Sequence, residues 1–139
     1  MKTFIQIATG VVLFAGLSGG VMAACAQPYL NGPAATTLLN GNTACSPANC
    51  NAAGCTWQEQ HRTNGELWDY KKGSDPVDPT SKEGTWSIAS TGKVTHSYSG
   101  GGGSYTYDVK SNGSGSYSFC GGPAEIFFSV KTGVAAGCP

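Results

Sequence analysis

Apolar and polar side chains alternate along the chain between Gly84 and Lys131, in short runs that glycine-rich turns separate. A β-strand presents successive side chains to opposite faces, so a period of two residues assigns one set of side chains to an interior. Strands of about five residues at a spacing of about ten, joined by tight turns, are typical of an antiparallel meander. The five strands predicted in this region are Thr85–Ala89, Val94–Tyr98, Tyr105–Val109, Tyr117–Cys120 and Glu125–Lys131.

The first half of the chain adds three strand candidates and two irregular segments. Asn64-Gly65 favours a two-residue hairpin turn, because both central positions of that turn need a positive φ. Residues 25–36 show no period and are predicted to form an extended arm. Lys72–Glu83 contains two Asp-Pro steps and is predicted to form a long stiff loop. The predicted strands are Thr37–Cys45, Trp57–Arg62 and Glu66–Lys71.

Eight antiparallel strands in simple succession predict an all-β fold over residues 37–139, as a single domain. An up-and-down barrel is the favoured arrangement, because closure removes both exposed sheet edges and leaves an interior that holds side chains or one small ligand. A two-sheet β-sandwich is the alternative, since the same alternation fits it.

The side chains assigned to the interior are rich in aromatic rings that end in a polar group. A buried carboxylate or imidazole is costly unless it is hydrogen-bonded, so Glu59, His61 and His96 need partners, which tyrosine hydroxyls can provide. The inward set consists of Trp57, Glu59, His61, Trp68, Tyr70, Trp86, Ile88, Val94, His96, Tyr98, Tyr105, Tyr107, Tyr117, Phe119, Ile126 and Phe128.

Such an interior suits a small aromatic or amphipathic ligand, which stacks on the rings while the polar groups orient it. The competing interpretation is a register shift of one residue, which would turn Glu59 and His61 to solvent as a surface pair and leave His96 as a core residue. The predicted ligand-binding residues are Trp57, Glu59, His61, Trp68, Tyr70, Trp86, His96, Tyr98 and Tyr107.

No cofactor is predicted, and metal binding is the weaker interpretation of the polar groups. Glu59 and His61 point the same way, and His96 is a candidate third ligand, which is enough for a zinc site with an open position. His61 with Glu59 or His96 could also act as a general acid and base. The sequence has no recognisable Ser or Cys nucleophile elbow and no phosphate loop, so binding is favoured over catalysis.

The amino end has the pattern of a secretory signal peptide, predicted over residues 1–24. Lys2 precedes an apolar run centred on Ile5–Leu17, and small residues follow it. That run is shorter than the roughly 20 residues of a membrane span, and no later stretch predicts one. The expected location is therefore secreted, periplasmic or in the cell envelope. Met22–Cys25 also resembles a degenerate bacterial lipoprotein signal, so a membrane tether is expected only if Cys25 is lipidated.

The charge balance excludes one class of partner. Of the eight Lys and Arg residues, Lys2 lies in the leader, which leaves seven against eight Asp and Glu residues. The basic residues are neither numerous nor clustered, so no surface is predicted to hold a nucleic-acid backbone. The expected partner is a small molecule or a secreted or envelope protein.

Six cysteines in a small exported chain predict three disulfides. In an up-and-down barrel the first and seventh strands run the same way, so their final residues are expected at one mouth. The residues that flank the barrel are expected at the opposite mouth. The predicted pairs are Cys45–Cys120, Cys25–Cys138 and Cys50–Cys55.

Gly84-Thr85-Trp86 resembles the Gly-x-Trp motif of the calycin-type barrels, the lipocalins and avidins. That resemblance implies a closed barrel in which the tryptophan closes one end over a ligand cavity. The stretch Tyr70–Trp86, with Tyr117–Cys120, resembles a small exported bacterial family of unassigned activity, which implies a secreted or envelope protein. A further analogy is with periplasmic lysozyme inhibitors that are small disulfide-bonded barrels.

The sequence favours a secreted or envelope-attached protein that binds a small molecule. The alternatives are a protein-interaction or hydrolase-inhibitor module that acts through its mouth loops, Ser46–Gly54 and Lys72–Glu83, and a structural envelope protein with a filled core.

Overall fold

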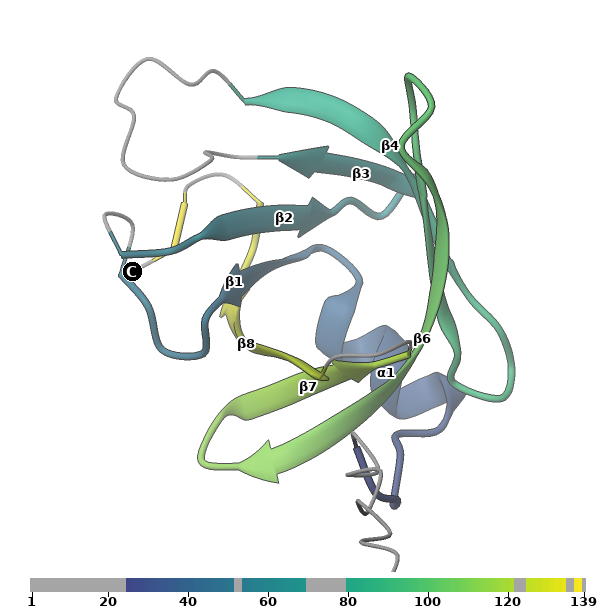
Figure 1. Ribbon diagram of the computed structural model, residues 1–139, viewed down its shortest axis with the longest axis vertical. Helices are drawn as coiled ribbons and strands as arrows, with labels where there is room; N and C mark the ends of the chain where they lie inside the picture. The colour runs from purple at the N-terminus through teal and green to yellow at the C-terminus, as the bar shows by residue number, and fades with distance from the viewer. Residues whose placement is uncertain (1–24, 52–53, 70–79, 122–124, 135–136, 139) are drawn as a thin grey trace, which may run out of the picture.

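The computed structural model describes residues 25–51, 54–69, 80–121, 125–134 and 137–138, which form a closed barrel of eight antiparallel strands with one α-helix (Figure 1). Each strand pairs with its neighbours in sequence, and β1 pairs with β8, so the predicted up-and-down barrel is confirmed. The predicted signal peptide lies outside the described residues. The elements are α1 Gly32–Leu39, β1 Asn42–Ser46, β2 Trp57–His61, β3 Glu66–Asp69, β4 Ser81–Ile88, β5 Val94–Tyr98, β6 Gly103–Gly113, β7 Ser116–Cys120 and β8 Glu125–Thr132.

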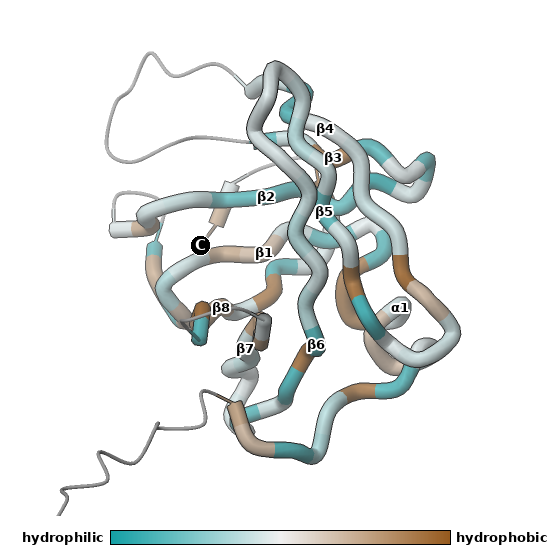
Figure 2. The backbone as a smooth tube through the Cα atoms, turned by 45° about the vertical axis from the view of Figure 1, so that its right-hand side comes forward, coloured by the Kyte–Doolittle hydropathy of each residue, from teal (hydrophilic) through white to brown (hydrophobic). Residues whose placement is uncertain are grey.

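The two ends of the barrel differ, and we name them by what covers them. Helix α1 immediately precedes β1 and contacts β1 and β4, so it lies at the end where β1 begins, which we call the closed end. The loops that follow β1, β3, β5 and β7 lie at the other end, which we call the mouth. Figure 2 shows the brown, strongly apolar segments of β5 and β6 toward α1, and paler segments beyond them.

The helix corrects two predictions, the extended arm over residues 25–36 and the strand beginning at Thr37. The side chain of Asn31 caps the helix by accepting a hydrogen bond from the Ala34 N–H, at 3.0 Å. Pro33 stands in the first turn, where its missing N–H costs nothing. Leu39 is fully buried under the barrel, so the apolar residues of this segment serve a helix, and the strand begins only at Asn42.

The apolar core fills the closed half of the barrel. The Phe119 and Phe128 rings are stacked, with centroids 4.1 Å apart and planes 14° apart. Val94, Val109 and Leu39 complete its fully buried part, with Ala44 beside them. The other partly buried side chains packed against it include Ile88, Tyr117 and Ile126, which belong to the predicted inward set.

The turn between β2 and β3 is one residue longer than predicted, and this changes which side chains of β3 face inward. A two-residue turn at Asn64-Gly65 would pair His61 with Trp68. Instead the Arg62 N–H donates to the Glu66 carbonyl, at 3.0 Å, and His61 pairs with Leu67. A shift of one residue exchanges the two faces of a strand. Leu67 is therefore fully buried, and the prediction that Trp68 faces inward is wrong.

A bulge in β4 changes a second pair of side chains. Leu67 pairs with Gly84, but the next residue, Trp68, pairs with Lys82, so Glu83 is the extra residue of β4. Bulges redirect side chains, and this one turns Glu83 toward the cavity described below and leaves Lys82 outside. Glu83 was predicted in a loop, whereas β4 begins at Ser81. Gly84 follows the bulge, where a Cβ would lie 2.0 Å from the Ser97 carbonyl oxygen, so only glycine fits.

All six cysteines form disulfides, but two of the three predicted pairs are wrong. Cys50–Cys55, within the loop after β1, agrees with the prediction. The two long-range links exchange partners, so that the structure has Cys25–Cys120 and Cys45–Cys138.

The stagger of the strands explains why Cys45 does not reach Cys120. Cys45 pairs with Ser129 of β8, and Ser129 pairs with Ser116 of β7, four positions before Cys120. At about 3.3 Å per residue this offset is about 13 Å along the strands. A disulfide needs Cα atoms within about 7 Å. The prediction placed the strand ends level and so neglected the tilt of strands in a barrel.

The segments that flank the barrel run back along its outer wall, which the prediction also missed. After β8, the Cys138 N–H donates to Gln58 Oε1 at 2.6 Å, and the Thr43 hydroxyl donates to the Gly133 carbonyl at 2.7 Å. These contacts place Gly133 and Cys138 against β1 and β2, where Cys138 bonds to Cys45. Before α1, the arm bonds through the Leu30 N–H to β6 and returns Cys25 to the mouth.

The disulfides bear on the compartment. Three disulfides in a small domain indicate an oxidising environment outside the cytoplasm. The sulfur of Cys25 is bonded to Cys120, so in this structure it is not available to carry a lipid. Within the described part of the chain, no helix has the length and apolar character needed to span a bilayer.

Candidate functional site

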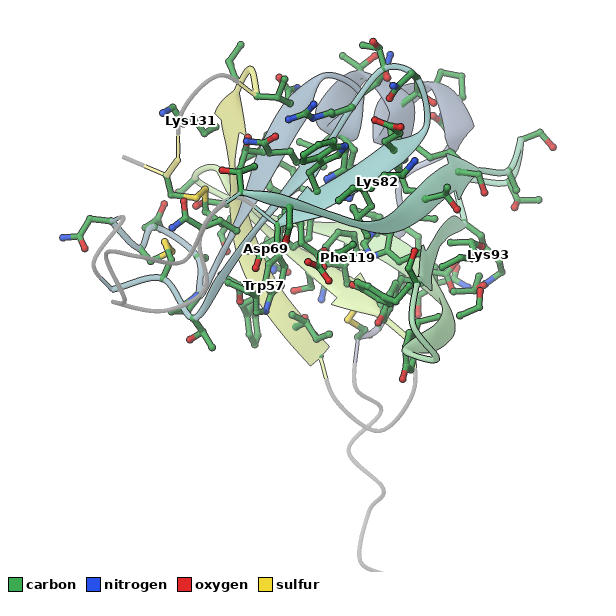
Figure 3. All side chains as sticks on the ribbon, turned by 90° about the horizontal axis from the view of Figure 1, so that it is seen from above. Trp57, Asp69, Lys82, Lys93, Phe119 and Lys131 are labelled. Carbon is green, nitrogen blue, oxygen red and sulfur yellow. A yellow bond between two sulfur atoms is a disulfide. The ribbon has the colours of Figure 1, made fainter. Side chains whose placement is uncertain are left out.

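A cavity of about 300 Å³ opens at the mouth of the barrel. The residues that line it include three carboxylates and several aromatic rings, and they come from seven of the eight strands, β2 to β8. Figure 3 shows Trp57, Asp69 and Phe119 close together near the centre of the barrel, viewed from above. The lining residues are Trp57, Glu59, Asp69, Glu83, His96, Tyr98, Tyr107, Phe119 and Ile126.

Five of the nine predicted ligand-binding residues line this cavity, namely Trp57, Glu59, His96, Tyr98 and Tyr107. His61 and Trp86 do not line it but lie in the interior, their rings in an edge-to-face contact with centroids 5.1 Å apart. The Trp86 N–H donates to the Arg62 carbonyl at 2.9 Å, which fixes that indole beside the turn between β2 and β3.

Of the remaining two predicted residues only Trp68 is described, and neither it nor Tyr105, a further member of the inward set, lines the cavity. Trp68 lies on the outer wall, where the Arg62 guanidinium stacks 3.9 Å from its ring centroid and its N–H donates to Glu66. Tyr70 lies outside the described residues. Tyr105 is 49 % exposed at the edge of the mouth, with its ring centroid 6.0 Å from that of Tyr98.

A chain of polar contacts runs from the cavity wall into the interior. The Tyr98 hydroxyl donates to Glu59 Oε1 at 2.5 Å, which confirms that a tyrosine supplies the partner Glu59 needs. The other oxygen of Glu59 lies 3.7 Å from His96 Nδ1. His96 Nε2 in turn lies 3.0 Å from His61 Nε2. Glu59 and His61 come from β2 and the other two residues from β5, so this series of contacts crosses the interior of the barrel.

Burial sets the charge of these groups. Burial raises the pKa of Glu59 to about 7; the hydrogen bond from Tyr98 opposes the shift, and the nearby carboxylates of Asp69 and Glu83 add to it. Burial lowers the pKa of His96 to about 4. Burial, and then the neighbouring His96, hold the pKa of His61 well below its usual value. Both imidazoles are therefore neutral at neutral pH, and the contact between Glu59 and His96 is not a full ion pair.

The two tyrosines of the wall are hydrogen-bond donors. Burial, followed by the nearby Glu59, raises the pKa of both Tyr98 and Tyr107, so both phenols stay protonated at all ordinary pH values. The Tyr98 hydroxyl donates its hydrogen bond to Glu59. The Tyr107 ring packs against His96, with centroids 5.6 Å apart, and helps to hold that imidazole in place.

Four cavity residues were not among the predicted ligand-binding residues. Phe119 and Ile126 were predicted only to face inward, and Asp69 and Glu83 were missed altogether. Asp69 pairs with Glu59 and so shares its face, but only in the register set by the longer turn. A three-residue turn ending in glycine is a common alternative to the two-residue turn, and it was the available signal. Glu83 faces the cavity because of the bulge, for which the period of two residues gives no signal.

The mouth loops proposed as an interaction surface are described only in part. The loop after β1 is described apart from residues 52 and 53, and it is closed on itself by Cys50–Cys55. Of Lys72–Glu83, residues 72–79 lie outside the described residues.

Comparisons of the chain with protein-family models, with curated proteins and with solved structures found no match. The closed, all-antiparallel barrel is consistent with a calycin-like fold, as the motif Gly84-Thr85-Trp86 implied, but it assigns the chain to no family.

Proposed function

We propose that this protein, acting outside the cytoplasm, binds one small aromatic or amphipathic molecule at the mouth of its barrel. The observation that carries the proposal is the cavity of about 300 Å³, in which aromatic rings and carboxylates converge. Ligand sites in proteins combine a mainly apolar wall with a few placed polar groups, and this volume is at the small end of their range of about 300–1,000 Å³.

The lining indicates which chemical features the ligand carries. Trp57, Phe119 and Ile126 offer an apolar surface to a ring. The carboxylates of Glu59, Asp69 and Glu83 accept hydrogen bonds, and the described lining includes no Lys or Arg. A ligand with donor groups, such as an amine or a hydroxyl, therefore matches the cavity, whereas a negatively charged ligand is repelled.

The first test is native mass spectrometry of protein purified from its own source, which should show one retained small molecule per chain. Calorimetric titration of ligand-free protein with two probes of the same ring tests the charge preference. We expect tryptamine, which carries an amine, to bind at least 10-fold more tightly than indole-3-acetate, which carries a carboxylate.

A matched pair of variants locates the site. Trp57→Leu should weaken binding of the retained molecule or of tryptamine about 10-fold, because ring stacking contributes about 0.5–1.5 kcal/mol beyond area burial. Trp68→Leu removes the same kind of side chain from the outer wall and should leave affinity unchanged. If no molecule is retained and neither probe binds, or if both variants weaken binding equally, the proposal is wrong.

A further inference from the structure

Two imidazoles and a carboxylate converge inside the barrel from strands that are not neighbours. Glu59 and His61 lie on β2 and His96 on β5, with β3 and β4 between those strands. One possible ligand atom of each residue lies within 4.8 Å of the other two. The side chains therefore meet in space through closure of the barrel, which no sequence spacing specifies.

The imidazole pair is poorly satisfied by the protein alone. His61 is fully buried and His96 is 2 % exposed. At 3.0 Å one Nε2 donates to the other, so this hydrogen bond satisfies one nitrogen of each ring and leaves only the two Nδ1 atoms to find other partners. Among the described residues no group hydrogen-bonds Nδ1 of His61, although the backbone of Glu59 lies close enough to favour its protonated form. Buried polar atoms are normally satisfied, so this pair calls for an explanation other than core packing.

We propose that Glu59, His61 and His96 bind a divalent transition-metal ion, with Zn²⁺ as the representative ion. Two imidazoles and a carboxylate are a ligand set that zinc-like ions prefer over Mg²⁺ and Ca²⁺. Bond lengths of about 2.0–2.2 Å in a tetrahedral site put ligand atoms about 3.3–3.5 Å apart. The two Nε2 atoms, at 3.0 Å, are close to that separation, and one ligand atom of Glu59 lies within 4.8 Å of one ligand atom of each histidine.

The surroundings fit a bound cation. Glu59 and His96 line the cavity, so the fourth position of a tetrahedral ion faces the mouth and is open to water or to a further ligand. Asp69 and Glu83 place two more carboxylates on the same wall, which offsets the charge of a divalent ion in a buried setting.

Aromatic rings hold the two imidazoles in position. Trp86 contacts His61 edge-on, and Phe119 contacts His96 in the same way with centroids 5.3 Å apart. A dry, packed shell of this kind limits ligand motion and so favours a defined metal geometry. Bound Zn²⁺ would connect β2 to β5 through the interior of the barrel and would raise the melting temperature.

The test uses protein without a histidine tag, stripped with a chelator, with no organic ligand present, and titrated with ZnCl₂ by calorimetry. We expect one ion per chain and a rise in melting temperature. Because Zn²⁺ alone is the probe, the result does not depend on whether a small molecule also binds. In the ¹⁵N NMR spectrum of the imidazoles, the ion should shift signals from both His61 and His96.

Three substitutions assign the ligands. His96→Gln should weaken Zn²⁺ binding at least 100-fold and Glu59→Gln at least 10-fold. Glu66→Gln is the matched control, because that carboxylate lies on the outer wall in contact with Lys82, and it should leave the affinity unchanged. Absence of stoichiometric binding, or binding that leaves both imidazole signals unmoved, would overturn the proposal. The NMR measurement on the unmodified protein decides the matter even if a substituted chain does not fold.

Discussion

Toward its closed end the barrel is filled by apolar side chains packed under α1, whereas its mouth is lined by three carboxylates and the imidazole of His96 and is braced by disulfides. The closed end needs no covalent support, because burying apolar area stabilises it directly. The mouth interrupts the core with groups that are costly to bury, and the cross-links lie where that stabilisation is lost. The comparison teaches that apolar packing stabilises one end of the barrel, whereas covalent links support the end that holds the carboxylates.

The largest expected effect is on the packing of the closed end. Phe128→Ala should lower the free energy of unfolding by about 3–5 kcal/mol, because it removes a fully buried ring stacked on Phe119. Phe127→Ala, at the neighbouring position of β8, removes a ring that is 49 % exposed and should cost far less. Urea denaturation of both variants measures the contrast, and equal losses would mean that the core does not lie where the structure places it.

The next effect concerns the mouth and compares two disulfides. Replacing Cys45 and Cys138 with serine should cost about 4 kcal/mol, because that link closes a loop with a sequence separation of 93. Replacing Cys50 and Cys55, with a separation of 5, should cost only about 2 kcal/mol on the same chain-entropy argument. Denaturation under non-reducing conditions gives both values. A larger loss of stability from replacing Cys50 and Cys55 would show that the short loop, and not the Cys45–Cys138 link, supports the mouth.

The charge state of the mouth predicts a pH dependence of stability in the metal-free protein. The pKa values of His61 and His96 are lowered in the folded protein, so below pH 6.5 the unfolded chain binds more protons than the folded one. The free energy of unfolding therefore rises with pH from about 4 to the ordinary histidine value of 6.5. The raised pKa of Glu59 acts in the opposite sense between 4.5 and about 7. The lowered pKa values of two histidines act against the raised pKa of one carboxyl group, so stability should rise with pH overall and reach its maximum near pH 6.5.

Glu59→Gln sharpens that prediction. Without the opposing carboxyl group, the rise between pH 4.5 and 6.5 should become steeper, and the slight fall between 6.5 and about 7 should vanish. Thermal unfolding at a series of pH values, with a chelator present, records both changes. An unaltered profile would mean that Glu59 does not hold its proton in the folded barrel.

The smallest expected effect tests the helix that covers the closed end. Asn31→Ala removes the side chain that caps α1 and should lower stability by about 1 kcal/mol. Thr37→Ala, at an exposed position within the same helix, makes no such contact and is the control. Comparable losses in the two variants would indicate that the cap contributes nothing.

The closed end and the mouth also differ in how far the sequence predicts them. Strict alternation and glycine-rich turns suffice for the barrel, because the pattern of each strand reports its own two faces. The arm and first strand failed because Ala34–Leu39 is short and apolar enough to serve either a strand or a helix, and only the cap at Asn31 favours the helix. In this region local capping decided the structure.

The mouth was predicted less completely, for reasons that concern pairs of strands. Glu59, His96 and Tyr98 follow from the period of two residues within single strands. Asp69 and Trp68 depend on the length of one turn, and Glu83 depends on a bulge that compares β4 with β3. The partners of Cys45 and Cys120 depend on the stagger accumulated across β8. Each of these is a relation between strands, which the pattern along one strand does not contain.

The crossing of the two long disulfides constrains the order in which a growing chain can be oxidised. Cys25 must wait for Cys120 and Cys45 for Cys138, and neither link can close before most of the barrel has emerged. Until Cys120 and Cys138 are present, the available thiols are those of Cys25, Cys45, Cys50 and Cys55, and any two of them can form a non-native disulfide. Oxidative refolding of the reduced chain should therefore give a higher yield of the native pairs when a disulfide isomerase is present than when only an oxidant is supplied.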